Sequence, residues 1–88
     1  MPATITSAPH AAVAIATGRT RSHIAEALRQ KHEAGVLRLR DHPDNVASVL
    51  LGLGDGITMQ LISDPGWDSD AAFELGIRTA RFLLGADD

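Results

Sequence analysis

The chain has 88 residues, a formal net charge of −3 and no cysteine. Its length allows one domain, and a chain this short buries only about 60–65% of its unfolded surface, so association with a partner is an expected source of stability. The acidic balance argues against binding to a phosphate backbone, and the lack of cysteine excludes disulfides and thiolate metal sites.

Residues 1–18 are predicted to be a flexible or partly helical lead. They have small side chains, two prolines and little charge, and only Ala11 to Ala16 are suited to a short helix. The segment lacks a clear apolar face. It also lacks the basic start and the long apolar run of a secretory signal, so we expect a cytoplasmic protein.

A first helix is predicted over residues 20–34. Ile24 and Leu28 lie on one apolar stripe at a spacing of four residues, and Gly35 is a suitable residue to end the helix. A short extended link follows, in which apolar residues alternate with charged ones.

The second helix is predicted over residues 43–63. His42 and Pro43 suit its entry, and the turn at residues 64–66 suits its end. Its apolar residues surround most of the helix, so we expect neighbours on more than one side. Four polar residues interrupt the apolar run and argue against a membrane span: Ser48, Asp55, Thr58 and Gln60.

The last helix is predicted over residues 69–84, with Asp68 or Ser69 as its N-cap and Gly85 at its end. Its apolar surface is also wider than one neighbour needs. Because the connection to the second helix is short, the two helices are expected to form an antiparallel hairpin. The first helix covers one side at most, which leaves an apolar face that marks an interface.

Small residues form one stripe on each of these two helices, at a spacing of four residues: Ser48, Gly52 and Gly56 on the second helix, and Ala72, Gly76 and Ala80 on the last. Gly52, Gly54 and Gly56 together cost about 3 kcal/mol in helix propensity, and such a cost needs a reason. Folding the hairpin about residue 66 brings the two stripes level, so that they face each other within the hairpin or face the same stripes of a second subunit. The interface residues predicted on this basis are Ser48, Gly52, Leu53, Gly56, Ala72, Gly76, Ala80 and Leu83.

The same folding places Asp55 level with Arg78. Asp55 either pairs with Arg78, reaches solvent, or lies at the inner end of a ligand pocket. A small apolar ligand would occupy an apolar cavity, and the residues predicted to bind it are Asp55, Met59, Trp67 and Phe73.

No pattern in the sequence predicts catalysis. The glycine-rich residues 49–56 depart from the dinucleotide-binding fingerprint, since the third glycine comes one residue early. The four histidines lack the spacing of metal ligands, and no activated nucleophile is recognisable. We therefore expect no catalytic residues, no metal, no cofactor and no enzymatic activity.

From Ser22 onward the residues form an ordered series of short motifs. These are Ile24-Ala-Glu-Ala-Leu-Arg29, Glu33-Ala-Gly35, Asp41-His-Pro-Asp44, Val46 to Gly56 with its central Asp-Gly, Asp64-Pro65, and Ala72-Phe-Glu continuing to Phe82-Leu-Leu-Gly85. The series resembles the C-terminal half of tetracycline-repressor-type (TetR-like) transcriptional regulators, over about three-quarters of the chain.

The resemblance implies an all-α regulatory domain over residues 19–88, with three main helices. In such regulators the last two helices form a four-helix bundle with those of a second copy, and the domain encloses a small-molecule pocket. The helix-turn-helix half of the family is missing here. The sequence therefore predicts a dimerisation and ligand-sensing domain that forms a homodimer but does not bind DNA itself. The alternative is a stand-alone small-molecule-binding or helper protein that forms a heterodimer with a full-length regulator.

Overall fold

The computed structural model describes the backbone of residues 2–86 and the side chains of residues 16–86. Residue 1 of the predicted lead and residues 87–88 of the predicted domain lie outside this part. The described chain is all-helical, with α1 over Pro2–Glu33, α2 over Pro43–Ser63 and α3 over Asp70–Leu83. The prediction of an all-α fold with three helices is thus confirmed, and no strand occurs within residues 2–86.

α1 is much longer than the helix predicted from residue 20. It begins at Pro2 and takes in the leading segment through residue 18. Proline is favourable at the first helical position, and alanine has the highest helix propensity, so the backbone of residues 11–16 supports the extension. The absence of an apolar face in the lead does not exclude a helix there, because a helix can form from propensity without such a face.

α1 ends at Glu33, just before Gly35, the residue that the sequence predicted to end this helix. Gly35 has a φ of 77°, a conformation that side chains with a Cβ rarely adopt. Its N–H donates to the carbonyl of His32 at 3.1 Å, and the N–H of Val36 donates to the carbonyl of Lys31 at 2.9 Å. These two bonds satisfy carbonyls that the end of a helix would otherwise leave without a partner.

Side chains cap the starts of α2 and α3. Nδ1 of His42, at the N-cap of α2, accepts a hydrogen bond from the N–H of Asp44 at 3.2 Å. At α3 the N-cap position is Ser69, but the bond comes from Asp68, whose Oδ1 accepts from the N–H of Asp70 at 3.1 Å. Each cap fixes the direction in which its helix leaves the preceding loop.

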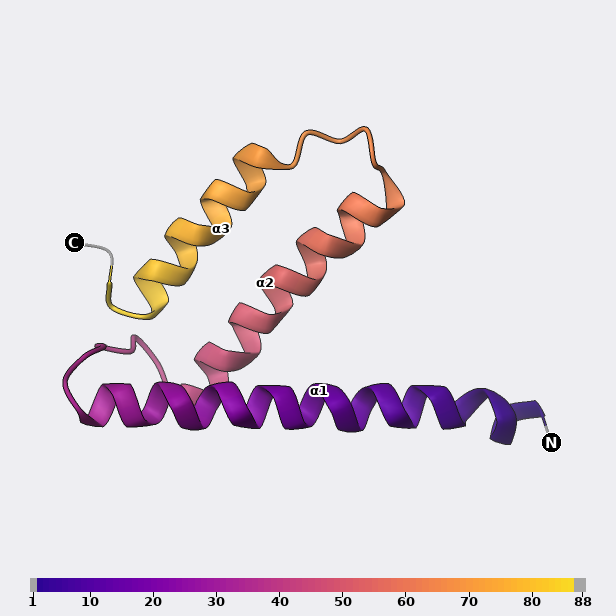
Figure 1. Cartoon of the computed structure of the whole chain (residues 1–88), viewed down its shortest axis with the longest axis horizontal. Coiled ribbons are helices and arrows are strands. Elements are labelled where there is room, and N and C mark those ends of the chain that lie inside the picture. Colours follow the sequence, from indigo (N-terminus) through magenta and orange to yellow (C-terminus); the bar gives the residue numbers. More distant parts are fainter. Residues whose placement is uncertain (1, 87–88) are drawn as a thin grey trace.

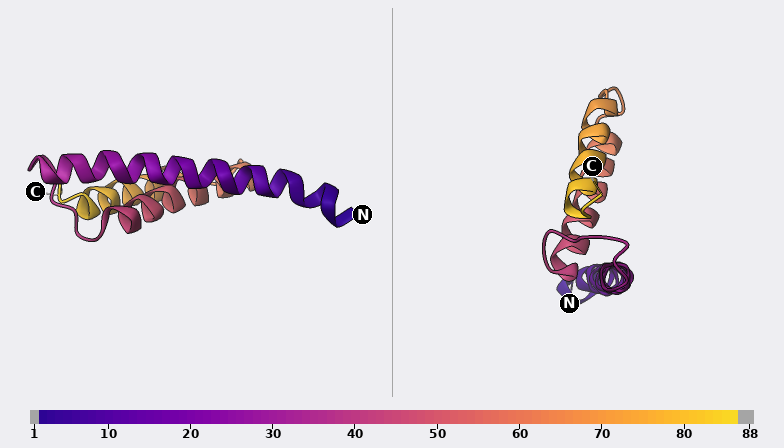
Figure 2. Two further views of the ribbon diagram at one scale, coloured as in Figure 1. Left: turned by 90° about the horizontal axis from the view of Figure 1, so that it is seen from below. Right: turned by 90° about the vertical axis from the view of Figure 1, so that its left-hand side faces the viewer.

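The three helices lie in a single layer. α2 leaves α1 near the end of that helix and runs away from it at an angle, and α3 returns beside α2 (Figure 1). Seen edge-on, no further helix packs on either face of this layer (Figure 2). The Cα atoms extend over 52 × 34 × 14 Å with a radius of gyration of 16.0 Å, whereas a compact chain of this length has about 12 Å.

The link between α1 and α2 holds the end of α3. The N–H groups of Arg38 and Arg40 donate to the carbonyls of Leu84 and Leu83, at 3.2 and 3.0 Å. The Nε of Arg40 donates to the carbonyl of Phe82 at 3.1 Å, and its guanidinium carbon lies 4.4 Å from the centre of the Phe82 ring. These contacts satisfy the last carbonyls of α3 and position that helix in the layer.

The core is small and lies where α1 crosses the start of α2. Its buried side chains are those of Ala25, Leu28, Val46 and Ala47. Six half-buried residues pack around them: Ile24, Leu37, Leu39, Leu50, Leu83 and Leu84. The core therefore joins α1, the link and one end of the α2–α3 pair, and it does not extend along that pair.

Candidate dimer interface and ligand groove

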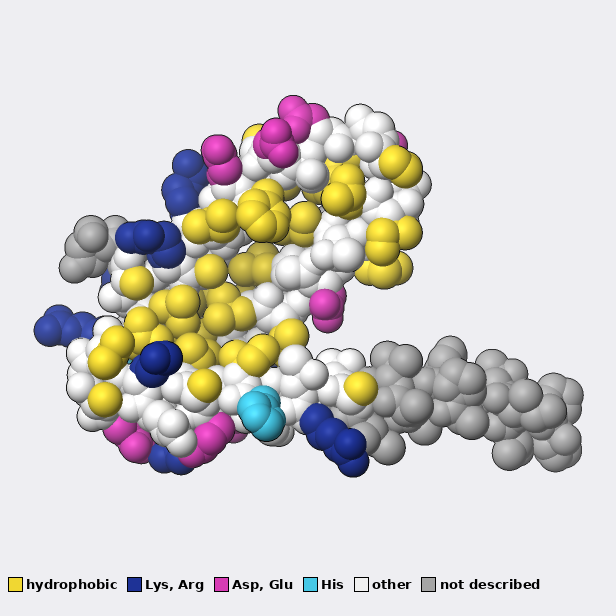
Figure 3. Space-filling view, viewed as in Figure 1, with side chains coloured by type: hydrophobic (Ala, Val, Ile, Leu, Met, Phe, Trp, Pro, Cys, Tyr) yellow, Lys and Arg dark blue, Asp and Glu magenta, His cyan; other side chains and the backbone are white. Residues whose placement is uncertain are grey.

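Large apolar side chains are exposed on both α2 and α3. Ile62 is 68% exposed, Met59 61% and Phe73 58%, although each would be buried in an ordinary core. The others on these two helices are Val49, Leu61, Leu75, Ile77 and Phe82. Space-filling atoms show a continuous apolar surface between the helices on the face in view (Figure 3). Apolar surface of this extent marks an interaction site.

The accessible surface area of the whole chain is larger than that of a compact protein of the same mass. The chain exposes 6541 Å², whereas a compact protein of 9.3 kDa exposes about 5,000 Å². The single layer and the length of α1 account for the difference of about 1,500 Å². A standard protein–protein interface takes about 800 Å² from each partner, so the surplus is large enough for one.

The two small-residue stripes do not face each other within the chain. A Cβ added to Gly52 or Gly56 would meet nothing within 4 Å beyond the helix itself. A Cβ on Gly76 would lie 3.3 Å from Cδ1 of Ile57. The stripe of α3 thus packs on an isoleucine of α2, while the glycines of α2 point into open space. Of the two arrangements considered from the sequence, contact between the stripes inside the hairpin does not occur.

A shallow groove of about 160 Å³ runs between α2 and α3. Three of the predicted interface residues line it, namely Leu53, Gly76 and Ala80. The rest of its lining is Leu50, Gly54, Ile57, Phe73 and Ile77. Among the other predicted interface residues, Ser48 and Gly52 are exposed, Gly56 and Ala72 are half-buried, and Leu83 packs against the core.

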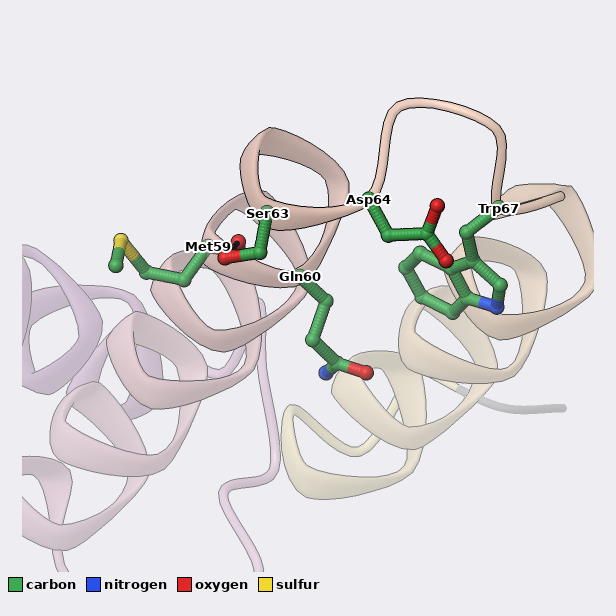
Figure 4. A pocket seen from close by; sticks show the side chains of 5 residues that line it. All are labelled: Met59, Gln60, Ser63, Asp64 and Trp67. Carbon is green, nitrogen blue, oxygen red and sulfur yellow. Dashed lines mark hydrogen bonds between the residues drawn. The ribbon is translucent and has the colours of Figure 1, made fainter.

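The second groove, of about 360 Å³, lies at the end of α2 and contains two of the predicted ligand-binding residues. Met59 and Trp67 line it together with Gln60, Ser63 and Asp64. The Trp67 indole lies beside the Asp64 carboxylate, and Met59 points away from Trp67 (Figure 4). Only Trp67 is half-buried and the other four are exposed, so the groove is open to solvent.

The three polar residues of this groove, Gln60, Ser63 and Asp64, were not predicted from the sequence. Met59 and Ser63, and likewise Gln60 and Asp64, are four residues apart, and that spacing places each pair on one side of a helix. This spacing was the available signal. Phe73 lines the groove between α2 and α3 instead, and Asp55 lines neither of the two grooves.

Asp55 reaches solvent. Its side chain is exposed, as is that of Arg78, and no ion pair joins them in the described structure. Of the three roles considered for Asp55, the solvent-exposed one agrees with this geometry. An exposed carboxylate has no desolvation cost and therefore needs no partner.

Arg29 forms two ion pairs on an exposed side of α1. Arg29 bonds to Glu26, and to Glu33 with a separation of 2.9 Å. The hydrogen bond from Arg29 lowers the pKa of Glu26. At the entry of α2 the side chain of Asn45 lowers the pKa of Asp41 by a hydrogen bond to its carboxylate. All these groups are exposed, where ion pairs contribute little to stability, so none indicates a catalytic site.

No cluster of three or more histidine, aspartate or glutamate residues that could hold a metal occurs in the part of the chain that the structure describes. α2 is long and apolar enough to cross a membrane, and only 11% of its most apolar window is buried. Length and composition alone are weak evidence for a span, because core helices of soluble proteins share them.

No protein-family model, curated protein or solved structure matches this chain. The resemblance to TetR-like regulators therefore stays a prediction, and functional inference depends on the surface just described.

Proposed function

We propose that the chain is a dimerisation and regulatory domain, in which α2 and α3 form an antiparallel hairpin that builds a four-helix bundle with the hairpin of a second copy. The observation that carries the proposal is the row of exposed large apolar side chains on a one-layer structure. A second layer would cover them, and an identical chain offers an apolar surface of the same kind.

The ordered motifs from Ser22 to Gly85 support the further proposal that this domain is of the TetR-like type. In that case the dimer is the regulatory half of a transcriptional regulator. We do not expect it to bind an operator by itself, since residues 1–18 do not resemble a helix-turn-helix and the chain is acidic.

The homodimer is tested with variants on its proposed surface. Phe73→Ser and Ile77→Ser remove exposed apolar side chains that line the groove between α2 and α3. Light scattering after size exclusion should show a wild-type dimer at micromolar concentration and a weaker dimer in each variant, because apolar burial at the contact is lost. The matched control is Val36→Ser, which alters an apolar residue on the link that is more exposed than either of them.

Two results would contradict this proposal. One is a wild-type chain that stays monomeric at these concentrations. The other is a dimer that Val36→Ser weakens as much as Phe73→Ser, because the contact would then not be specific to α2 and α3.

Ligand sensing is a second part of the proposal, supported by the groove that Met59 and Trp67 share. Trp67 is the only tryptophan, so its fluorescence reports on this groove alone. We expect the dye anilinonaphthalene sulfonate, which joins an apolar aromatic part to a sulfonate, to quench this fluorescence with saturation, and Met59→Ala to weaken the quenching. Quenching that rises linearly with dye concentration would contradict a binding site here.

A further inference from the structure

Four charged residues lie on one side of α3. Asp70, Glu74 and Arg78 follow each other at a spacing of four residues, and Arg81 comes three residues later. At 3.6 residues per turn the four fall within about 80° of arc. We call this set the charged stripe. Its first half is acidic and its second half is basic, and acidic and basic side chains gather accordingly over the two ends of α3 (Figure 3).

Within the described side chains, the charged stripe has no ion-pair partner. All four side chains are exposed, and none of them makes an ion pair within residues 16–86. Acidic residues at the start of a helix and basic residues at its end do complement the helix dipole. The dipole accounts for the sign at each end, but it does not require that the four residues share one side.

Exposed apolar residues flank the charged stripe on both sides. Phe73 and Ile77 lie along one side and Leu75 and Phe82 along the other, each 48–58% exposed. Charged residues that border an apolar contact in this way set the orientation of paired helices, as the e and g positions of a coiled coil do. The charged stripe is thus placed at the rim of the surface assigned to the dimer.

We propose that the α3 helices of two copies lie side by side in opposite directions, with the acidic half of each charged stripe facing the basic half of the other. This arrangement rests on the proposed homodimer. Asp70 of one copy then lies opposite Arg81 of the other, and Glu74 opposite Arg78. The two pairs share nearly the same midpoint along α3, next to Gly76, so one register serves both.

The order of charges along the stripe favours a second copy as the occupant. A stripe that reads acidic then basic is complementary to itself only when two copies run in opposite directions. A parallel pair would bring like charges together along the whole of the stripe.

Charge reversal tests the direction. One variant carries Asp70→Lys with Glu74→Lys, a second carries Arg78→Glu with Arg81→Glu, and a third carries all four changes. Sedimentation equilibrium at low salt measures the dimer dissociation constant, and circular dichroism checks the helix content. Each two-residue variant should dimerise at least about tenfold more weakly than wild type, because two attractive contacts per stripe become repulsive. High salt should reduce this difference by screening.

The four-residue variant distinguishes the proposal from a loss of folding. It opposes the helix dipole at both ends, yet it restores opposite charges across an antiparallel contact, so its dissociation constant should return to within about threefold of wild type. An equimolar mixture of the two two-residue variants should likewise form a one-to-one dimer.

Three outcomes would overturn the arrangement. The first is a dimeric wild type whose dissociation constant the two-residue variants do not change, which would leave the proposed homodimer standing. The second is a four-residue variant that dimerises no better than the two-residue variants. The third is a monomeric wild type, which would contradict the proposed function itself.

Discussion

Gly85 is the residue at which a single methyl group should do the most damage to this fold. It follows the last turn of α3 with a φ of 69°, and a Cβ added there would lie 2.0 Å from the carbonyl oxygen of Arg38. Such an approach is impossible for real atoms, and the obstacle is backbone rather than a side chain that could turn away. Gly85→Ala must therefore displace the link from the end of α3.

The cost has two parts. An alanine in the left-handed conformation costs about 1–2 kcal/mol. Displacement also breaks the hydrogen bonds from Arg38 and Arg40 to α3, at about 0.5–1.5 kcal/mol each. The sum is about 2–5 kcal/mol of unfolding free energy. Urea unfolding at a fixed chain concentration measures it.

Gly35→Ala is the matched control. Gly35 also follows a helix end with a positive φ, of 77°, but a Cβ there would meet nothing within 4 Å. It should lose only the conformational part, about 1–2 kcal/mol. If both variants lose the same free energy, the contact between the link and the end of α3 does not contribute to stability, and the reasoning fails.

Three further predictions follow from the same structure. Gly56→Leu should preserve helix content, because nothing lies within 4 Å of a Cβ there, but it should weaken dimerisation. The control is Gly18→Leu, which has equally open surroundings on α1. Equal effects of the two changes on dimerisation, measured by sedimentation, would refute a role for the small stripe of α2. Leu28→Ala should lower the free energy of unfolding in urea by about 2–5 kcal/mol, because it empties part of the small core. The control, Val36→Ala on the surface, should lower it by less than about 0.5 kcal/mol. An equally small loss for Leu28→Ala would refute the assigned core. Because the pKa of Asp41 is lowered in the folded state, its carboxylate stabilises the fold above the unfolded pKa of about 3.9, and this stability is lost as the pH falls through the lower folded pKa. Asp41→Asn should therefore reduce the slope of unfolding free energy against pH on the acid side. An unchanged slope would contradict the hydrogen bond assigned to Asp41.

The helices that carry strong local signals could be predicted from the sequence. Proline at the entry of α2 and the glycine after α1 mark their boundaries with residues that suit those positions alone. The length of α1 could not be predicted in this way. Its first half has no amphipathic pattern, so hydrophobic periodicity, the main sequence signal for a helix, did not indicate a helix there.

The placement of side chains across α2 and α3 was harder to predict. Counting back from the turn correctly brought Gly76 near the middle of α2, but the rotation of each helix about its axis depends on packing. Ile57, rather than Gly56, meets Gly76. For the same reason Asp55 does not line the groove that Met59 and Trp67 share. A shift of one residue turns a helix by about 100°, and spacing along the chain does not fix that angle.

The central claim is that the apolar surface of α2 and α3 is covered by a second copy of the chain. The mass of the wild-type protein, measured by light scattering after size exclusion over a range of micromolar concentrations, tests this most directly. We expect the mass of two 9.3 kDa chains, which falls toward the mass of one chain on dilution. A single-chain mass at every concentration would contradict it.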